Sequence, residues 1–431
     1  MKASEQVVLG SGYRGVPPGV SEITKSAFEA KGWHPAGGQM SLPVLSLDKN
    51  IFYNNVQVMH QIARAFDAQL APHGKTPMSP AIAQMMVAAG SWGVSVADMR
   101  QASVMLESGI ERVLLANEIG GRAAVARLLD LIKRYPTSEI ALFVDSAEFF
   151  EALEAAWIEQ EMDASLGLLI DIGCGRGGVE DPVVAERLIQ RIGRTRAPGI
   201  QCIGVAAYEG TAMRETQEET EAVLKELFDR VASAFKALRE SVGDERKLIL
   251  SAGGSTFFDY VIRMSGPIVE NDPNAFLLLR SGACYFSDNG RIRQRLMKIA
   301  DRGLLGQAVS QVIRGAFHPA LRLWAEVISQ NSDNQAICGL GLRDASHDQG
   351  LPVPLQLWRD GTAISLLEGI AETTKLNDQH SFVQLTGVEV KVGDVIEFGI
   401  RHPCTCIDKH ALVFGLGSKN TVDTVYQTYF G

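Results

Sequence analysis

The chain has 431 residues, of which 46% are hydrophobic, and its 41 basic and 50 acidic side chains give a net charge of −9. This length and composition are typical of a globular protein of two or three domains, and the absence of a Lys/Arg run argues against a nucleic-acid partner. No signal-peptide-like or membrane-spanning apolar segment stands out, and six scattered cysteines do not make a disulfide framework. We therefore expect a cytoplasmic protein with reduced thiols and no membrane partner.

Short apolar runs alternate with helical patterns from about residue 41 to 285. The runs are LPVLSL (42–47), QLAP (69–72), WGVSVA (92–97), RVLLAN (112–117), IALFVD (140–145), LGLLIDIG (166–173), IQCIGVAAY (200–208), KLILSAG (247–253) and AFLLLRSG (275–282). Their nearly continuous apolar character is typical of parallel strands that are covered on both faces. Because eight runs remain when the first is set aside, we predict a closed (β/α)8 TIM barrel.

The pattern changes after about residue 310. ALRLWAEVIS, PVPLQLW, SFVQLTGVEV, DVIEFGI and ALVFGL are short runs, several of them alternating, and turns such as RDG, LTG and KVGD separate them. This pattern predicts antiparallel β structure. The predicted organisation is an N-terminal segment (1–48), an α/β barrel (49–310) and a smaller antiparallel β domain (311–431).

Residues that follow the barrel strands are candidates for the active site, because functional groups of this barrel lie at the C-terminal ends of its strands. These positions hold His73, Lys75, Asn117, Asp145, Arg176, Tyr208, Gly253, Gly254, Ser255, Gly282 and Ala283. A lysine that faces glycine-rich turns suits an amine that forms an imine beside a phosphate-binding turn. We therefore interpret Lys75 as a functional residue, although most lysines are solvated surface residues.

A glycine-rich segment, GCGRGG (173–178), matches the G-x-G-x-x-G pattern of dinucleotide-binding proteins. It follows the sixth apolar run and does not begin a βαβ half, and no acidic residue stands about 20 positions later at a strand end to hold a ribose hydroxyl. We therefore reject a dinucleotide cofactor. The glycines are interpreted as allowing Arg176 to approach a group bound over the barrel mouth.

Seven short motifs occur in one order along the chain: PHGKT, DIGCGRGGV, AAYEG, SAGGST, LRSGACYFSD, NDQHSF and RHPCTCIDK. Together they resemble the alanine racemase-like (fold type III) pyridoxal-phosphate enzymes, in particular the branch of D-serine dehydratase and low-specificity D-threonine aldolase. The resemblance extends from about residue 40 to the C-terminus. It implies a homodimer whose active sites lie between one barrel and the partner's β domain, and it places the strand LPVLSL in the β domain.

The resemblance also assigns residues to the cofactor, pyridoxal 5'-phosphate. Lys75 matches the lysine that carries the cofactor as an imine, Arg176 the arginine that faces the pyridine nitrogen, and Tyr208 a tyrosine that contacts the cofactor. His73 is expected in the same pocket. The phosphate is expected on the backbone of Gly253, Gly254, Ser255, Gly282 and Ala283. Because an arginine cannot protonate the ring nitrogen, the cofactor would be a weak electron sink, and a metal ion would assist at the β-carbon.

The segment RHPCTCIDKH (401–410) is a candidate metal site. Read as an extended strand, it would direct His402, Cys404 and Cys406 to one face, about 6.6 Å apart. The family pattern carries metal on His402 and Cys404, and imidazole with thiolate favours zinc, with Mn²⁺ or Mg²⁺ as alternatives. Cys406 could be a third ligand or, as we favour, a small buried residue.

Three further histidines are less defined. His380, in the NDQH motif, matches a family position near the metal and could be a partner of the metal ligands or an acid–base group, or a solvated loop histidine. His318 and His410 are interpreted as structural residues.

These assignments favour β-elimination of water from a small D-β-hydroxy amino acid such as D-serine, with Lys75 removing the α-proton. The first alternative is retro-aldol cleavage of D-threonine-like substrates to glycine and an aldehyde. In the family, aldolases tend to have Asp at the position of Cys404, which favours the dehydratase. A pyridoxal-phosphate carrier without turnover is a third interpretation, which the predicted β domain disfavours. An amino-acid racemase would need a second base that the sequence does not identify.

Overall fold

The computed structural model describes residues 7–332 and 334–430. Eight parallel strands form one sheet in the order β4-β11-β10-β9-β8-β7-β6-β5. They are β4 (Ala68–Leu70), β5 (Val94–Val96), β6 (Arg112–Leu115), β7 (Glu139–Val144), β8 (Leu166–Ile172), β9 (Ile200–Ala207), β10 (Leu248–Ala252) and β11 (Ala275–Leu279). The two ends of the sheet meet, because Trp92 N–H donates to the carbonyl of Leu70 at 2.7 Å and Gly74 N–H to that of Ser95 at 2.7 Å. The predicted barrel is thus confirmed.

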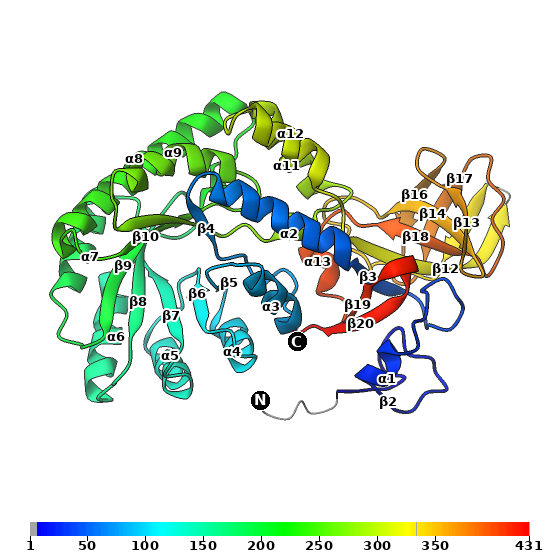
Figure 1. Ribbon diagram of the computed structural model, residues 1–431, viewed down its shortest axis with the longest axis horizontal. Helices are drawn as coiled ribbons and strands as arrows, with labels where there is room; N and C mark the ends of the chain where they lie inside the picture. Colours follow the sequence, from blue (N-terminus) through cyan, green and yellow to red (C-terminus); the bar gives the residue numbers. More distant parts are fainter. Residues whose placement is uncertain (1–6, 333, 431) are drawn as a thin grey trace.

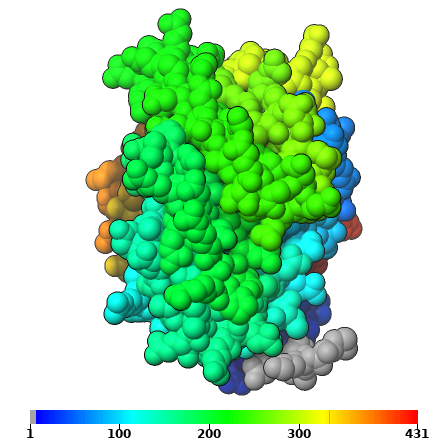
Figure 2. All heavy atoms as spheres, turned by 90° about the vertical axis from the view of Figure 1, so that its left-hand side faces the viewer, coloured from blue at the N-terminus to red at the C-terminus, as the bar shows by residue number. Residues whose placement is uncertain are grey.

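Helices cover the outside of these strands (Figure 1). They are α2 (Lys49–Arg64), α3 (Pro80–Ala88), α4 (Met99–Glu107), α5 (Arg122–Arg134), α6 (Ala147–Glu159), α7 (Pro182–Gly193), α8 (Gln217–Val242) and α9 (Phe258–Glu270). Their starts follow from side chains that accept backbone N–H bonds: Asp98 caps α4, Ser146 caps α6, and Thr216 forms a capping box with Glu219 in α8. Figure 2 shows the end of the molecule formed by the barrel, where the green segments cover most of the face.

The second sheet has ten strands and is antiparallel apart from one pair. Its strands are β3 (Val44–Asp48), β12 (Leu321–Ser332), β13 (Gln335–Cys338), β14 (Val353–Arg359), β15 (Thr362–Leu366), β16 (Ala371–Leu376), β17 (Ser381–Leu385), β18 (Val395–Gly399), β19 (Leu412–Leu416) and β20 (Val422–Gln427). The early strand β3 pairs antiparallel with β12 and parallel with β19. The predicted antiparallel sheet is therefore present, whereas the domain boundaries at residues 48 and 310 stay predictions.

A small N-terminal unit packs on this sheet. It contains β1 (Val8–Leu9), β2 (Ile23–Thr24) and α1 (Lys25–Glu29), and Phe28 is buried with Phe414 and Trp324. Short one-turn helices η1 (Glu209–Ala212) and η2 (Ser418–Asn420) follow β9 and β19. Within the described residues, no helix combines the length and apolarity needed to cross a membrane.

The segment after β11 joins the barrel to the β domain. It forms α10 (Ala283–Phe286), α11 (Arg291–Arg302) and α12 (Gln307–Ala316), and Asn289 N–H donates to the carbonyl of Ile400 at 2.8 Å. This contact brings the helix α13 (Cys404–Ile407) to the junction of the barrel and the β domain (Figure 1). The predicted metal segment therefore lies close to the first barrel turn.

Candidate active site

Lys75 lies in the turn that follows β4 and lines a small cavity at the barrel mouth. The turn is held by Gly74 N–H, which donates to Ser95, and by Met78 N–H, which donates to Gly74 at 2.9 Å. The cavity is lined by His73, Lys75, Ala97, Ala116, Asn117, Phe143, Arg176, Tyr208, Gly254 and Arg280. The structure thus brings together residues from the ends of several barrel strands, including five that the sequence analysis assigned to the cofactor.

The surroundings of Lys75 favour its neutral form. Lys75 keeps contact with solvent at the cavity mouth, but the protein around it removes part of its hydration. This partial burial is the largest cause of its lowered pKa, and the charges of Arg176 and Arg280 lower the pKa further. The Cys404 thiol acts in the opposite direction. A lysine with a lowered pKa has more free amine at neutral pH, which is the form that attacks an aldehyde and that can accept a proton.

His73 is held neutral beside Lys75. Burial lowers the pKa of His73 well below its usual value, and the charges of Lys75, Arg280 and Arg176 lower it further. Its Nδ1 atom is buried and has no hydrogen-bond partner within the described residues. A buried polar atom without a partner is unusual in a folded protein, so this nitrogen is available to a bound group.

Arg176 projects from a tight hairpin and stacks on Tyr208. Its guanidinium lies 4.4 Å from the centre of the Tyr208 ring. The hairpin is closed by Gly173 N–H, which donates to Val179 at 2.9 Å. Gly178 has φ +85°, and a Cβ there would lie 2.6 Å from the Gly173 nitrogen. The glycines of the GCGRGG segment are thus explained by a hairpin that presents Arg176 to the cavity.

The two glycine-rich turns differ in which amides are available. The N–H groups of Gly253 and Gly254 donate to the buried carboxylate of Glu209, at 3.2 Å and 2.6 Å. In contrast, the N–H groups of Ser255, Gly282 and Ala283 make no hydrogen bond within residues 7–332 and 334–430. These turns follow the last two barrel strands and precede the short helix α10, the place where TIM barrels often bind phosphate. Of the five residues predicted for phosphate, three therefore offer free amides.

Arg280 and Glu209 are site residues that the sequence analysis missed. Arg280 is buried at the end of β11, where Nη1 donates to Ser251 Oγ at 2.8 Å and Nη2 to the carbonyl of Ala207 at 2.7 Å. The arginine at the end of the apolar run LLLR could have indicated it, because a charge there needs a buried partner. Glu209 had no comparable indication, since its role depends on a turn from a different strand.

The segment 402–407 is not an extended strand, so that expectation was wrong. Pro403 begins a helical turn, and its carbonyl accepts the N–H groups of Cys406 at 3.2 Å and Ile407 at 2.9 Å. Because residues 404–407 are helical, Cys406 does not share a strand face with His402 and Cys404. Cys406 is fully buried, and burial raises the pKa of its thiol to about 12. This environment supports the interpretation of Cys406 as a small buried residue.

His402 interacts with Cys404, and the carboxylate of Asp348 bonds to the His402 ring. His402 Nδ1 lies 2.6 Å from Asp348 Oδ2, and Thr405 Oγ1 donates to Asp348 Oδ1 at 2.7 Å. A hydrogen bond to Cys404 is the largest cause of the raised pKa of His402, and Asp348 adds to it. Burial opposes ionisation of Cys404, but His402, Thr76 and the charge of Lys75 lower the pKa of the thiol overall.

The donor set suits a metal ion with open positions. A carboxylate that accepts from one histidine nitrogen orients the other toward a metal, and a thiol with a lowered pKa supplies the thiolate that binds it. Among the described residues, no cluster of three or more His, Cys, Asp or Glu has metal-binding geometry. An ion here would be held by two protein ligands, His402 and Cys404, with room for water and substrate.

The remaining histidines lie away from this pair or are buried. His380 is exposed in the turn before β17, and its backbone carbonyl accepts from Asn377 at 2.8 Å. Its predicted role near the metal stays a prediction. His410 is buried, and its Nε2 lies 2.8 Å from the carbonyl of Asp344. His318 bonds through its backbone to Asn55 at the junction of the two domains.

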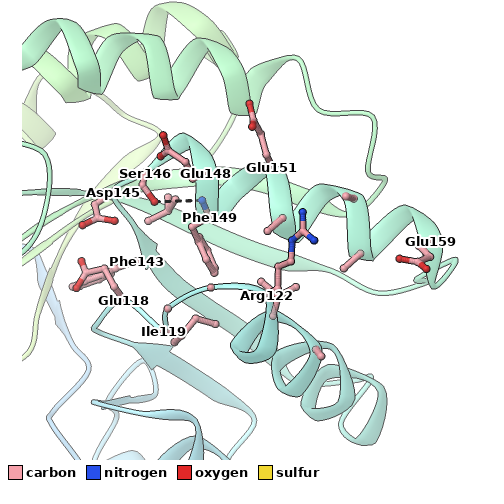
Figure 3. Close-up of a pocket in the computed structure, with 18 of the residues that line it drawn as sticks. Glu118, Ile119, Arg122, Phe143, Asp145, Ser146, Glu148, Phe149, Glu151 and Glu159 are labelled. Atoms are coloured by element: carbon pink, nitrogen blue, oxygen red, sulfur yellow. Dashed lines mark hydrogen bonds between the residues drawn. The ribbon is translucent and has the colours of Figure 1, made fainter.

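A larger cleft lies elsewhere, between the β6–α5 turn and helix α6. It has a volume of about 950 Å³, and acidic side chains line much of it: Glu118, Asp145, Glu148, Glu151 and Glu159. Figure 3 shows Glu118 and Asp145 at one end of the cleft and Glu159 at the other. Lys75 does not line this cleft, and the five carboxylates of the cleft do not suit the negative charge of a phosphate group. We therefore place the active site at the smaller cavity.

Comparison with known proteins agrees with this site. The alanine racemase, N-terminal domain, model matches residues 47–260, and the putative serine dehydratase domain model matches residues 320–416. The first match contains Lys75 and the second contains His402 and Cys404. This chain belongs to the alanine racemase-like, fold type III family. The resemblance expected from the sequence is confirmed, and membership in this family supports pyridoxal phosphate as the cofactor.

The curated relatives in this family are lyases. A D-threonine aldolase from Arthrobacter sp. is 27% identical over 351 residues, which cover 80% of this chain and 81% of that protein. A 3-hydroxy-D-aspartate aldolase from Paracoccus denitrificans (strain Pd 1222) is 25% identical over 394 residues, or 90% and 91% of the two chains. A D-threo-3-hydroxyaspartate dehydratase from Delftia sp. (strain HT23) is 26% identical over 253 residues, or 54% and 65%. The predicted enzyme class is thereby confirmed.

Solved structures of the family share this fold. The D-threonine aldolase from Filomicrobium marinum superposes with a TM-score of 0.71 at 23% identity, covering 90% of this chain and 95% of that one. The dehydratase from Delftia sp. HT23 gives a TM-score of 0.67 at 20% identity, with 92% and 99% covered. The similarity therefore spans both the barrel and the β domain.

The residues in and beside the cavity fit the cofactor. Lys75 has a lowered pKa, His73 Nδ1 lacks a partner, and the amides of Ser255, Gly282 and Ala283 are free. An aldehyde, a ring and a phosphate each find a suitable group among them. No separate site for such a molecule has to be assumed.

Proposed function

We propose that this chain is a pyridoxal-phosphate- and metal-dependent lyase of D-β-hydroxy amino acids, with elimination of water as its main reaction. The observation that carries the proposal is the contact between Thr76 Oγ1 and Cys404 Sγ, 3.3 Å apart. Thr76 is the neighbour of Lys75 in the chain, so this contact supports a metal-binding pair close to the proposed cofactor-binding lysine. Groups that act on the α-carbon and on the β-hydroxyl would thus be adjacent.

Residues in and beside the cavity have distinct roles in this proposal. Bound pyridoxal phosphate supplies an electron sink for the bond broken at the α-carbon. Lys75 would hold the cofactor covalently and, once released by the substrate, its neutral amine would accept the α-proton. Arg176 would face the pyridine ring, and the free amides of Ser255, Gly282 and Ala283 would bind the phosphate.

The metal is proposed to be zinc, held by His402 and Cys404. Its chemistry would be that of a Lewis acid on the β-hydroxyl, which makes hydroxide a better leaving group. A neutral imidazole and a thiolate are preferred zinc ligands. The related dehydratase has been solved as a His-to-Ala mutant and as a Cys-to-Ala mutant in the metal-free form, at positions with the same spacing as His402 and Cys404.

Retro-aldol cleavage is the second candidate reaction. Of the relatives described above, the two whose similarity covers 80% or more of this chain are named as aldolases. One acts on D-threonine and the other on 3-hydroxy-D-aspartate, according to their names. The same site would serve, with the metal holding the hydroxyl while a base removes its proton. We favour dehydration because Cys404 replaces the aspartate that aldolases tend to have at this position.

A substrate panel tests the proposal. The holoenzyme with defined Zn²⁺ is incubated with D-serine, D-threonine, D-threo-3-hydroxyaspartate and their L-enantiomers, and keto acid, glycine and aldehyde are measured separately. Dehydration predicts keto acid and ammonia from the D-substrates only. Glycine with an aldehyde would decide for the aldolase. An enzyme that turns over none of the D-β-hydroxy amino acids would refute the proposal.

Three further expectations belong to this proposal. The protein is cytoplasmic, it works as a homodimer, and it consists of the segments 1–48, 49–310 and 311–431. Cysteines such as Cys202 and Cys284 are buried and form no disulfide within the described residues, which is compatible with a reducing compartment. Light scattering on the purified protein measures the mass, and a monomer of 46.7 kDa at working concentration would contradict the dimer.

A further inference from the structure

A cation that the sequence analysis did not assign lies beside the phosphate-binding turn. Arg295, on helix α11, donates from Nη1 to Thr256 Oγ1 at 2.8 Å. Thr256 follows Ser255 directly, so the guanidinium is fixed at the end of the turn after β10. An arginine has five N–H donors, and this bond uses one of them.

The charge of Arg295 has no carboxylate partner, unlike that of its neighbour on the same helix. Arg302 pairs with both oxygens of Asp259, at 2.7 Å and 2.8 Å. Arg295 has no carboxylate within 4 Å among the residues that the structure describes. Asp288 acts on it only over a longer distance, and its carboxylate is engaged by backbone amides at the start of α11.

A second cation, Arg291, repels the charge of Arg295 and makes its charged form less stable when no anion is bound. Arg291 lies one helical turn earlier, on the same side of α11, and both side chains are half-buried. Burial and the charge of Arg291 lower the pKa of Arg295 to about 10. Two half-buried guanidinium groups side by side are stabilised when an anion neutralises them.

The backbone around Arg295 offers donors of the same kind. The amides of Ser255, Thr256, Gly282 and Ala283 have no acceptor in the described parts of the chain, whereas Glu209 occupies those of Gly253 and Gly254. Free amides with a guanidinium group form the donor set that binds a phosphate monoester.

We propose that Arg295 binds the phosphate group of the cofactor, through guanidinium N–H groups that Thr256 does not use. The inference rests on the proposed function, because it takes pyridoxal phosphate as the occupant of the cavity. Thr256 positions the guanidinium, the amides of Ser255, Gly282 and Ala283 complete the donors, and Arg291 adds positive charge at longer range. Cofactor affinity would thus depend on a side chain outside the two glycine-rich turns.

The test compares two forms of the vitamin that differ only in the phosphate. Apoenzyme is titrated with pyridoxal phosphate and with pyridoxal, and binding is followed by the absorbance of the cofactor. Arg295→Met is expected to lower the affinity for pyridoxal phosphate about 10- to 100-fold, which is the range for the loss of charge-assisted hydrogen bonds. The affinity for pyridoxal should fall less than about twofold. The matched control is Arg293→Met, which removes the same charge from an exposed position two residues away.

A second measurement uses inorganic phosphate as the probe. It should slow reconstitution by pyridoxal phosphate in the unmodified protein and in Arg293→Met, and have a weaker effect in Arg295→Met. If Arg295→Met does not fold, Arg295→Lys serves instead, because lysine keeps the positive charge but lacks the paired N–H donors of the guanidinium group. A five- to tenfold weaker affinity for pyridoxal phosphate is then expected.

Three outcomes would overturn the inference: unchanged affinity for pyridoxal phosphate in Arg295→Met or Arg295→Lys, equal weakening of both ligands, or a raised KM for substrate with unchanged cofactor affinity. Failure of the proposed function would look different. There, the unmodified protein would itself form no covalent adduct between pyridoxal phosphate and Lys75.

Discussion

Asp348 is the hydrogen-bond partner of His402, with 2.6 Å between Oδ2 and the ring nitrogen Nδ1. The bond occupies Nδ1 and leaves Nε2 of the ring available to a metal ion. A histidine whose ring is fixed in this way is a better metal ligand, because its tautomer and orientation are set before the ion binds.

Replacing Asp348 by Asn should therefore weaken metal binding. The expected loss is roughly 10- to 100-fold in affinity, as for other carboxylates behind a metal-bound histidine. Competition of the apoprotein with a chromophoric chelator for Zn²⁺ measures it directly. Asp360→Asn, in an exposed turn of the same sheet, is the control and should bind zinc normally. Equal affinities of the two variants would show that Asp348 has no part in the metal site.

Removal of the metal should separate cofactor binding from turnover. A chelator is expected to abolish the release of keto acid from D-serine while the absorbance of the bound cofactor stays, because Lys75 and the phosphate-binding amides do not depend on the ion. Adding Zn²⁺ back should restore activity. The rate of pyruvate formation and the cofactor spectrum are recorded on the same sample. Full activity of the metal-free protein would exclude a catalytic metal.

Lys75→Ala should lose both the covalent cofactor and the reaction. The reason is that, among the residues the structure describes, Lys75 is the only lysine that lines the cavity, and its pKa is lowered there. Turnover should fall by about 10⁴-fold or more, since the variant lacks both the amine that holds the cofactor and the base. Borohydride reduction followed by peptide mapping should label Lys75 in the unmodified protein. Label on another lysine would contradict the assignment, and Lys391→Ala, far along the chain and exposed, is the control.

The stability of the β domain should fall as the pH falls below 6.5, because His410 is buried in its neutral form. Burial lowers the pKa of His410 to about 4, and its Nε2 bonds to the carbonyl of Asp344. Between pH 6.5 and 4 the unfolded chain binds a proton that the folded chain excludes, so the free energy of unfolding decreases by roughly 3 kcal/mol at most over this window.

Denaturant unfolding at pH 7.5, 6, 5 and 4 measures this loss. His410→Gln should remove much of the slope between pH 6.5 and 4, even if the variant is less stable at every pH. His347→Gln, at an exposed position, should leave the slope unchanged. A slope that persists in His410→Gln would assign the pH dependence to other groups.

The barrel could be predicted because its strands are buried on both faces. All eight runs expected between residues 69 and 280 became strands, since parallel strands under helices must be apolar throughout. The edge strands β15 and β16 were missed because most of their side chains are exposed, so TAISL and AETTKL show little apolar alternation. The helical turn at Cys404 was also missed, because the His-x-Cys spacing was read with a strand period although Pro403 favours the start of a helix.

The site was predictable where residues follow a strand and not where the fold brings distant segments together. Lys75, Arg176 and Tyr208 could be found from the rule for barrel strands. Asp348 lies 54 residues before its partner His402 and has no local motif that would connect the two. Arg295 was missed for the same reason, since its contact with Thr256 depends on how α11 packs against the barrel.

The contact between Thr76 and Cys404 joins segments that are 328 positions apart in the chain. A ribosome must therefore translate past Cys404 before the proposed reacting centre can assemble. Neither a prematurely terminated product nor a proteolytic fragment cut in the segment between β11 and β12 would contain both halves of that centre. Such a barrel-only fragment would keep the amine proposed to bind the vitamin but lack the His402–Cys404 pair proposed to hold the metal ion.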